Sequence, residues 1–218
     1  MQRTVDMTVG SPTKHILKFS LPLIAANMGQ QLYAIADASI VGRGVGVMAL
    51  AAVGATDWIY CMILWTIIGL TQGFSTFVSR YFGEKDFTKV NKVIAMGSLL
   101  TGASGILLTV VSLLAAGPLL ALMGTPTEIF GDATAYISIM AGGTVAIAAY
   151  NWAASVLRAF GDGKSPLIAM VIAAVLNIGL DLLFVFSFGW GIYGAAAASV
   201  TSQAVSFFFC LTRLKKID

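Results

Sequence analysis

The chain has 218 residues, of which 58% are hydrophobic and only 11% are charged, and its net charge is +3 at neutral pH. Soluble domains carry a charge on about a quarter of their residues, and their apolar residues recur in stripes. Because the apolar residues here form long blocks, the composition excludes a soluble globular domain and indicates an integral membrane protein.

The apolar blocks predict membrane spans in chain order. Runs without any charged residue cover 19–36, 58–79, 93–127 and 133–157. The block 165–212 contains a single charge, Asp181. Since a span needs about 20 apolar residues, this last block must hold two helices, and the sequence FGWG at 188–191 is the expected break.

The third block ends in helix-breaking residues. Gly117, Pro118, Gly124 and Pro126 crowd its second part, so a helix is expected to end near residue 116 and to be followed by a re-entrant or interfacial turn. The sequence therefore predicts an all-α integral membrane fold, a bundle of six transmembrane helices over residues 16–212. Their expected bounds are about 16–41, 50–79, 90–116, 130–157, 165–187 and 192–212.

Lysine and arginine predict the orientation. All but one of the thirteen basic residues fall on one side of the predicted spans, and only Arg43 falls on the other. The positive-inside rule then makes the tail 1–15 and the end 213–218 cytoplasmic. No basic patch with interleaved aromatic residues suggests a nucleic-acid partner.

Two cytoplasmic loops resemble each other. The sequences RYFGEKD at 80–86 and RAFGDGK at 158–164 share Arg, Phe, Gly and an acid in the same order. Either the two halves arose by duplication, or both loops use the same way to end a helix, a glycine cap followed by charged residues.

Two acids lie deep inside the predicted spans, whereas Asp57 is near the outer end of its span, where it could reach the membrane interface, and Asp132 belongs to an outer loop. At 1.5 Å per residue, Asp37 falls about 8 Å and Asp181 about 10 Å below the outer ends of their helices. Asn177 precedes Asp181 by four residues, so both side chains share one helix face. Ser199 and Thr201 fall at a similar depth in the last helix. An oxygen-rich cluster is expected from Asp37, Asn177, Asp181 and Ser199.

Burial predicts the chemistry of this cluster. Two carboxylates in a low-dielectric site cannot both be ionised at low cost, so one should hold a proton or the pair should bind a cation. Carboxylate, amide and hydroxyl oxygens suit Na⁺ as well as a proton, and they offer no soft ligand for zinc or copper. The alternative is that each aspartate is a structural hydrogen-bond partner of a neighbouring helix.

Five motifs give the chain a family resemblance over nearly its whole length. It resembles the amino-terminal half of a multidrug and toxic compound extrusion (MATE) transporter. The motifs are FSLPLIAANMGQQLYAIADASIVGRGVG, GFSTFVSRYFGEKD, SVLRAFGDGKSP, LNIGLDLLF and GIYGAAAASVTSQ. The resemblance implies a cation-coupled antiporter in the cytoplasmic (inner) membrane that exports organic cations, drugs and other amphiphiles against Na⁺ or H⁺, without enzymatic activity or a further cofactor.

The resemblance also implies roles for particular residues. Asp37, Asn177 and Asp181 match the coupling-ion site of the family, and Ser199 stands where the family often has threonine. Asn151 matches a family asparagine, so that it is either in the second shell of the site, as Thr201 could be, or outside the cluster. Pro22 lies one or two turns into the first helix, where it permits a kink or hinge.

The family has twelve helices in two lobes, and this chain covers one. The resemblance therefore implies a second six-helix lobe as partner, either in a longer chain that continues from 213–218 or in a homodimer. Further partners are membrane lipid and a small amphiphilic or cationic substrate. Three other functions compete: a lipid-linked-oligosaccharide flippase of the same superfamily, an intramembrane aspartyl protease and a passive channel. Flippases tend to place several basic residues in the cavity, and we expect none inside these spans.

Overall fold

The computed structural model describes residues 12–216, and the part of the chain that it describes is helical with short turns and no strand. The helices are α1 (Pro12–Gly44), α2 (Val47–Gly83), α3 (Phe87–Leu122), α4 (Thr127–Gly142), α5 (Thr144–Ala159), α6 (Lys164–Asp181), the π-helical segment η1 (Leu182–Ser187) and α7 (Gly191–Leu214).

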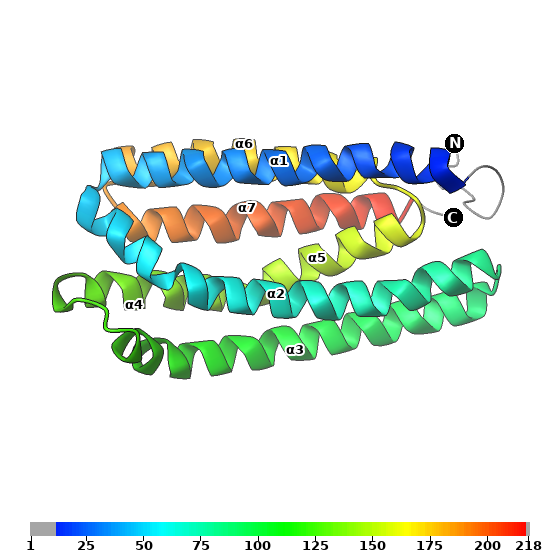
Figure 1. Ribbon diagram of the computed structural model, residues 1–218, viewed down its shortest axis with the longest axis horizontal. Helices are drawn as coiled ribbons and strands as arrows, with labels where there is room; N and C mark the ends of the chain where they lie inside the picture. The colour runs from blue at the N-terminus through cyan, green and yellow to red at the C-terminus, as the bar shows by residue number, and fades with distance from the viewer. Residues whose placement is uncertain (1–11, 217–218) are drawn as a thin grey trace.

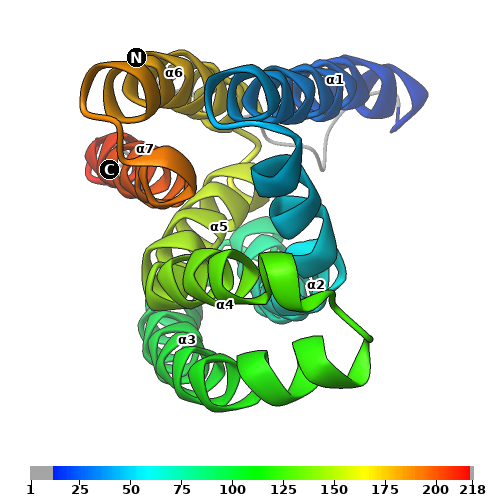
Figure 2. The ribbon, with the colours of Figure 1, turned by 90° about the vertical axis from the view of Figure 1, so that its left-hand side faces the viewer.

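The helices lie roughly side by side along one long axis (Figure 1). Helices α1 and α6 form one side of the molecule, α2 and α3 form the other, and α7 and α5 lie between them (Figure 2). Both ends of the described chain, the α2–α3 turn and the α5–α6 turn gather at the same end of the bundle (Figure 1). The predicted all-α membrane fold is confirmed.

Four helices are long and apolar enough to cross a membrane: α2, α3, α6 with η1, and α7. The bent pair α4 and α5 makes a fifth span if it is counted as one. Most residues in the apolar windows of the four spans are not buried inside the bundle, and α3 exposes Leu99, Ile106, Leu107 and Leu114 on its outer face. Such a surface is stable against lipid rather than water.

Helix α3 is longer than the sequence indicates. It does not end near residue 116 but continues through Gly117 and Pro118 to Leu122, and its last turns bend away from the long axis (Figures 1 and 2). Proline removes one backbone hydrogen bond from a helix and kinks it. The expected break is therefore a bend within a continuous helix.

The single helix expected over 130–157 is instead two helices. Helices α4 and α5 meet at Gly143 with a bend of 46°. A side chain on Gly143 would collide with Val200 of α7, so glycine lets the α7 backbone approach the bend. Beside the bend, the Thr109 hydroxyl of α3 donates a hydrogen bond of 3.1 Å to the Ala141 carbonyl oxygen.

A glycine of α3 also allows close packing. Gly97 of α3 faces the indole ring of Trp152, whose Nε1 donates to the hydroxyl of neighbouring Ser98 at 2.8 Å. Phe74 of α2 contacts the same ring edge to face, with the centroids 6.3 Å apart. By contrast, a Cβ on Gly102 would meet nothing within 4 Å, and the same holds at Gly142, so neither glycine is needed for close packing.

These two positions of α3 give a matched test of packing. Gly97→Ala should destabilise the chain by about 1–3 kcal/mol because the added methyl displaces the Trp152 ring. Gly102→Ala should be neutral or stabilise by up to about 1 kcal/mol, since alanine is the better helix former. Thermal unfolding in detergent measures both, and equal melting temperatures for the two variants would contradict this packing.

Candidate functional site

Helices α1, α6 and α7 meet around Asp181. Asp181 and Asn177 of α6 have no exposed surface, and Ser199 of α7 is 5% exposed. Asp37 of α1 is half-buried and its carboxyl group is within hydrogen-bonding reach of that of Asp181. The structure therefore brings together the four residues that the sequence predicts as a cluster.

The Asn177 amide joins α6 to α7. When its Nδ2 donates to Asp181 Oδ2 at 2.7 Å, its Oδ1 accepts from the Ser199 hydroxyl at 3.2 Å and from the Ser199 backbone N–H at 3.1 Å. In the opposite orientation the amide oxygen would face the carboxylate, and Nδ2 would donate only to the Ser199 hydroxyl. The first orientation is favoured because it satisfies both ends of the amide.

The two carboxyl groups are only partly satisfied. Asp37 Oδ1 and Asp181 Oδ1 are buried without a hydrogen-bond partner among the described residues. Two facing carboxylates repel unless a proton or a cation lies between them. The described residues contain no group of three or more His, Cys, Asp or Glu able to hold a metal. Two carboxylates, an amide and a hydroxyl instead suit a proton or a hard cation such as Na⁺.

A π-helical segment begins directly after Asp181. In η1 the turns widen, and the Phe188 N–H bonds the Leu183 carbonyl oxygen, five residues earlier, at 3.0 Å. Val185 of η1 packs against Val41, one turn after Asp37. π-helical turns are rare and occur often at functional sites. This segment is not predictable from the sequence, because the apolar run LLFVFS has no feature that distinguishes a π-helix from an α-helix.

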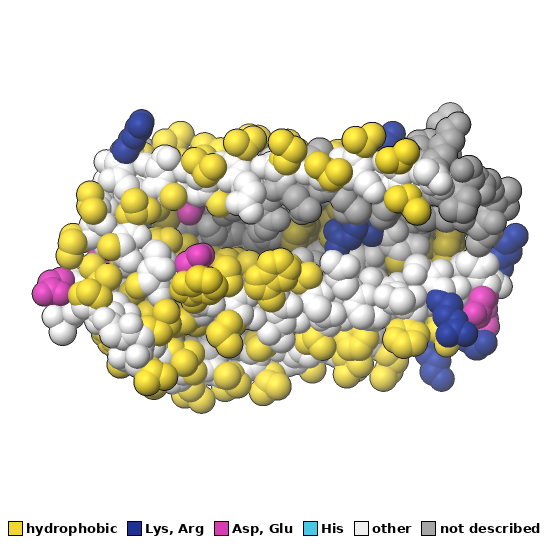
Figure 3. Space-filling model, in the orientation of Figure 1, with side chains coloured by type: hydrophobic (Ala, Val, Ile, Leu, Met, Phe, Trp, Pro, Cys, Tyr) yellow, Lys and Arg dark blue, Asp and Glu magenta, His cyan; other side chains and the backbone are white. Residues whose placement is uncertain are grey.

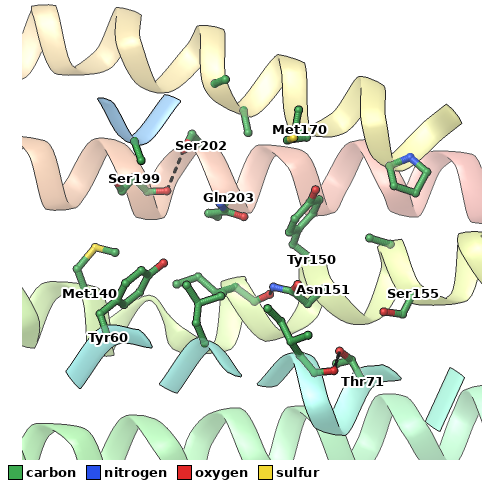
Figure 4. A pocket seen from close by; sticks show the side chains of 18 of the residues that line it. Tyr60, Thr71, Met140, Tyr150, Asn151, Ser155, Met170, Ser199, Ser202 and Gln203 are labelled. Atoms are coloured by element: carbon green, nitrogen blue, oxygen red, sulfur yellow. Dashed lines mark hydrogen bonds between the residues drawn. The ribbon is translucent and has the colours of Figure 1, made fainter. Parts of the chain in front are cut away.

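A cavity of about 1080 Å³ adjoins the cluster. Its walls come from α1, α2, α4, α5, α6 and α7, and Tyr60, Tyr150 and Gln203 are among the side chains that line it (Figure 4). Asp37 and Ser199 line the cavity, whereas Asn177 and Asp181 lie behind its wall. Asp37 thus belongs to both the cluster and the cavity.

The remaining predicted site residues lie outside the cluster. Asn151 is on the cavity wall away from Ser199 (Figure 4), and its Nδ2 donates to the Ile147 carbonyl oxygen of its own helix at 2.9 Å. Thr201 is exposed and donates to the Ala197 carbonyl oxygen at 2.7 Å. Asn151 therefore takes the second of the two alternatives that the sequence left open, outside the cluster, and Thr201 is exposed rather than in a second shell. Pro22 lies within α1, but its side chain is outside the described part of the structure.

Two charged cavity residues were missed. Asp57 was expected near the membrane interface and Arg158 in a cytoplasmic loop, yet both line the cavity. The expectation that the spans contain no basic side chain is therefore wrong. The spacing of residues in α5 could have indicated that Arg158 faces the cavity. The cavity-lining positions of α5 recur every three or four residues, as expected for one helix face. They are Ile147, Tyr150, Asn151, Ala154, Ser155, Arg158 and Ala159.

Comparison with known proteins identifies the family. A family model described as MatE matches residues 22–183. The chain belongs to the MatE family. It is 33% identical over 216 residues to a probable multidrug resistance protein, YpnP, of Bacillus subtilis (strain 168), and this match covers 96% of the chain and 47% of YpnP.

Solved structures agree with this assignment. A MATE transporter in the bent conformation superposes with a TM-score of 0.88 at 32% identity, over 94% of this chain and 46% of that one. A multidrug resistance MATE transporter in the outward-facing conformation gives 0.91 at 31% identity, over 98% and 47%. The chain spans about half the length of the curated relatives that it matches.

The buried amide of Asn177 gives a test of the cluster. Asn177→Leu leaves Asp181 and Ser199 without their shared partner and should destabilise the chain by about 1–3 kcal/mol. Asn151→Leu is the control, because that amide bonds only its own helix, and it should cost less. Melting temperatures in detergent compare the two, and an equal or larger loss for Asn151→Leu would contradict the assigned hydrogen bonds.

Proposed function

We propose that this MatE chain is one lobe of a cation-coupled antiporter that exports organic cations, drugs or other amphiphiles. The coupling ion, Na⁺ or H⁺, binds at Asp37, Asn177, Asp181 and Ser199. The protein is a multi-pass membrane protein, and we place it in the cytoplasmic membrane with both ends cytoplasmic. We expect no enzymatic activity and no cofactor other than the coupling ion.

The main support for this proposal is that the carboxyl groups of Asp37 and Asp181 face each other beside the cavity. Asp37 reaches both the cluster and the cavity wall, so occupancy of the cluster changes the charge that a substrate meets. A proton or Na⁺ neutralises the pair and weakens the attraction for a cationic substrate. Such a difference in affinity between ion-bound and ion-free states is what antiport requires.

Helix α1 is the element that ion binding can move. On the α6–α7 side, Asp181 is tied to Ser199 through Asn177, whereas Asp37 is only half-buried. Losing the ion would leave two negative charges facing each other across α1 and α6. Pro22 is the proposed hinge, because proline weakens the helix where α1 must bend.

The substrate pathway is the cavity, completed by a second lobe. The relatives are about twice as long as this chain, which supports a partner lobe that covers the open side. The orientation rests on the gathering of basic side chains at the end that holds both chain ends and the α2–α3 and α5–α6 turns (Figures 1 and 3).

Ion binding can be measured on the purified chain by tryptophan fluorescence. Trp190 is the local reporter, because its ring lies 5.1 Å from that of Phe184 in η1. Na⁺ should change the fluorescence of the native chain, and Asp37→Asn or Asp181→Asn should abolish the change. Lowering the pH should weaken Na⁺ binding, since protons compete for the same carboxylates.

Asp57→Asn is the matched control, because Asp57 lines the same cavity outside the cluster. It should keep the Na⁺ response. A folded native chain that responds to neither Na⁺ nor pH, or an unchanged response in Asp181→Asn, would reject the ion site.

A further inference from the structure

Acidic and basic side chains lie at different positions along the cavity. Among the described residues its charged lining side chains are Asp37, Asp57 and Arg158. Acidic side chains lie near one end of the hollow between α1 and α2, and basic ones lie deeper along it (Figure 3). Arg158 is in the last turn of α5, one turn after Ser155, which lies at the opposite end of the cavity from Ser199 (Figure 4).

The repeated loop sequence explains why Arg158 faces the cavity. In the first copy, Arg80 and Glu84 are four residues apart and form an exposed ion pair of 3.1 Å. The equivalent residues of the second copy are Arg158 and Asp162. Asp162 is buried and caps α6 instead, because its Oδ1 accepts from the backbone N–H groups of Lys164 and Ser165 at 3.1 and 2.9 Å.

The Arg158 guanidinium therefore has spare donors. It has five N–H groups, and within the described residues it makes one hydrogen bond, from Nη2 to the Ser155 hydroxyl at 2.9 Å. On the α2 side, the cavity wall is lined by the uncharged residues Thr71, Ser75 and Ser79. Their hydroxyl groups donate to carbonyl oxygens of α2 itself. A half-buried guanidinium without a carboxylate is a strong site for a planar anion.

We propose that Arg158 binds the anionic group of an amphiphile, a carboxylate, phosphate or sulfonate, whose apolar body lies in the cavity. This inference rests on the proposed function and specifies the other amphiphiles among its substrates as organic anions and zwitterions. A zwitterion would place its cationic end toward Asp37 and Asp57. The same chemistry would hold the phosphate of a lipid head group, so the test must separate a soluble amphiphile from lipid.

The test compares 2-naphthoate with 2-naphthamide, which differ only in the group that Arg158 would bind. Binding is measured by calorimetry on the chain in a maltoside detergent, which carries no phosphate. The native chain should bind the carboxylate about tenfold more tightly than the amide, as expected for one charge-assisted hydrogen-bonded contact. Arg158→Gln should remove this preference, and Arg158→Lys should keep part of it.

Arg80→Gln is the matched control, because Arg80 is exposed and already paired with Glu84. It should keep the tenfold preference. If Arg158→Gln does not fold, Ser155→Ala serves instead, since it frees the guanidinium and should keep or increase the preference. Equal binding of the two probes by the native chain, or an unchanged preference in Arg158→Gln, would overturn the proposal.

Nanodiscs that contain phosphatidylglycerol identify the source of the anion. If the naphthoate preference persists in them, Arg158 selects a soluble amphiphile. If it falls in the native chain as the anionic lipid is added, a lipid phosphate occupies Arg158. The Na⁺ response of the same samples is recorded in parallel, so failure of the ion site and failure of the anion site are read independently.

Discussion

Inside this membrane protein, the carboxyl group of Asp37 in α1 faces that of Asp181 in α6. Asp37 and Asp181 each have an oxygen without a partner among the described residues. If both carboxyl groups were ionised, their repulsion would push α1 away from α6. Whatever neutralises the pair therefore holds the two helices together. Asp181 is fixed by Asn177, whereas Asp37 stands at the wall of the cavity.

Adjacent residues of α7 connect this pair to the rest of the lobe. Ser199 bonds Asn177 on one side, and the next residue, Val200, packs against Gly143 at the bend between α4 and α5. The bend directs α5 along the cavity, so one face of α5 carries Tyr150, Asn151 and Arg158 into the wall. The cluster and the cavity are thus parts of one packing arrangement.

The sequence predicts what depends on hydrophobicity and helical spacing. Long apolar runs predict the membrane fold. The four-residue spacing of Asn177 and Asp181 places them on one helix face, and the estimated depths predict that Asp37 and Ser199 lie near them. The predictions are wrong where backbone hydrogen bonding or tertiary contacts determine where a helix ends or which way a side chain points. Pro118 bends α3 without ending it, Gly143 divides one predicted helix, and the π-helical turns after Asp181 have no sequence signal. Arg158 was misplaced because its partner acid caps α6 instead.

Infrared spectroscopy of the purified chain shows whether Asp37 and Asp181 can both be ionised without a bound cation. In the absence of Na⁺ at neutral pH, the native chain should show the carbonyl stretch of a buried protonated carboxyl group. Na⁺ should abolish that band, and Asp37→Asn should lack it from the start. Two ionised carboxylates in Na⁺-free buffer, with no protonated band in a folded chain, would contradict the account.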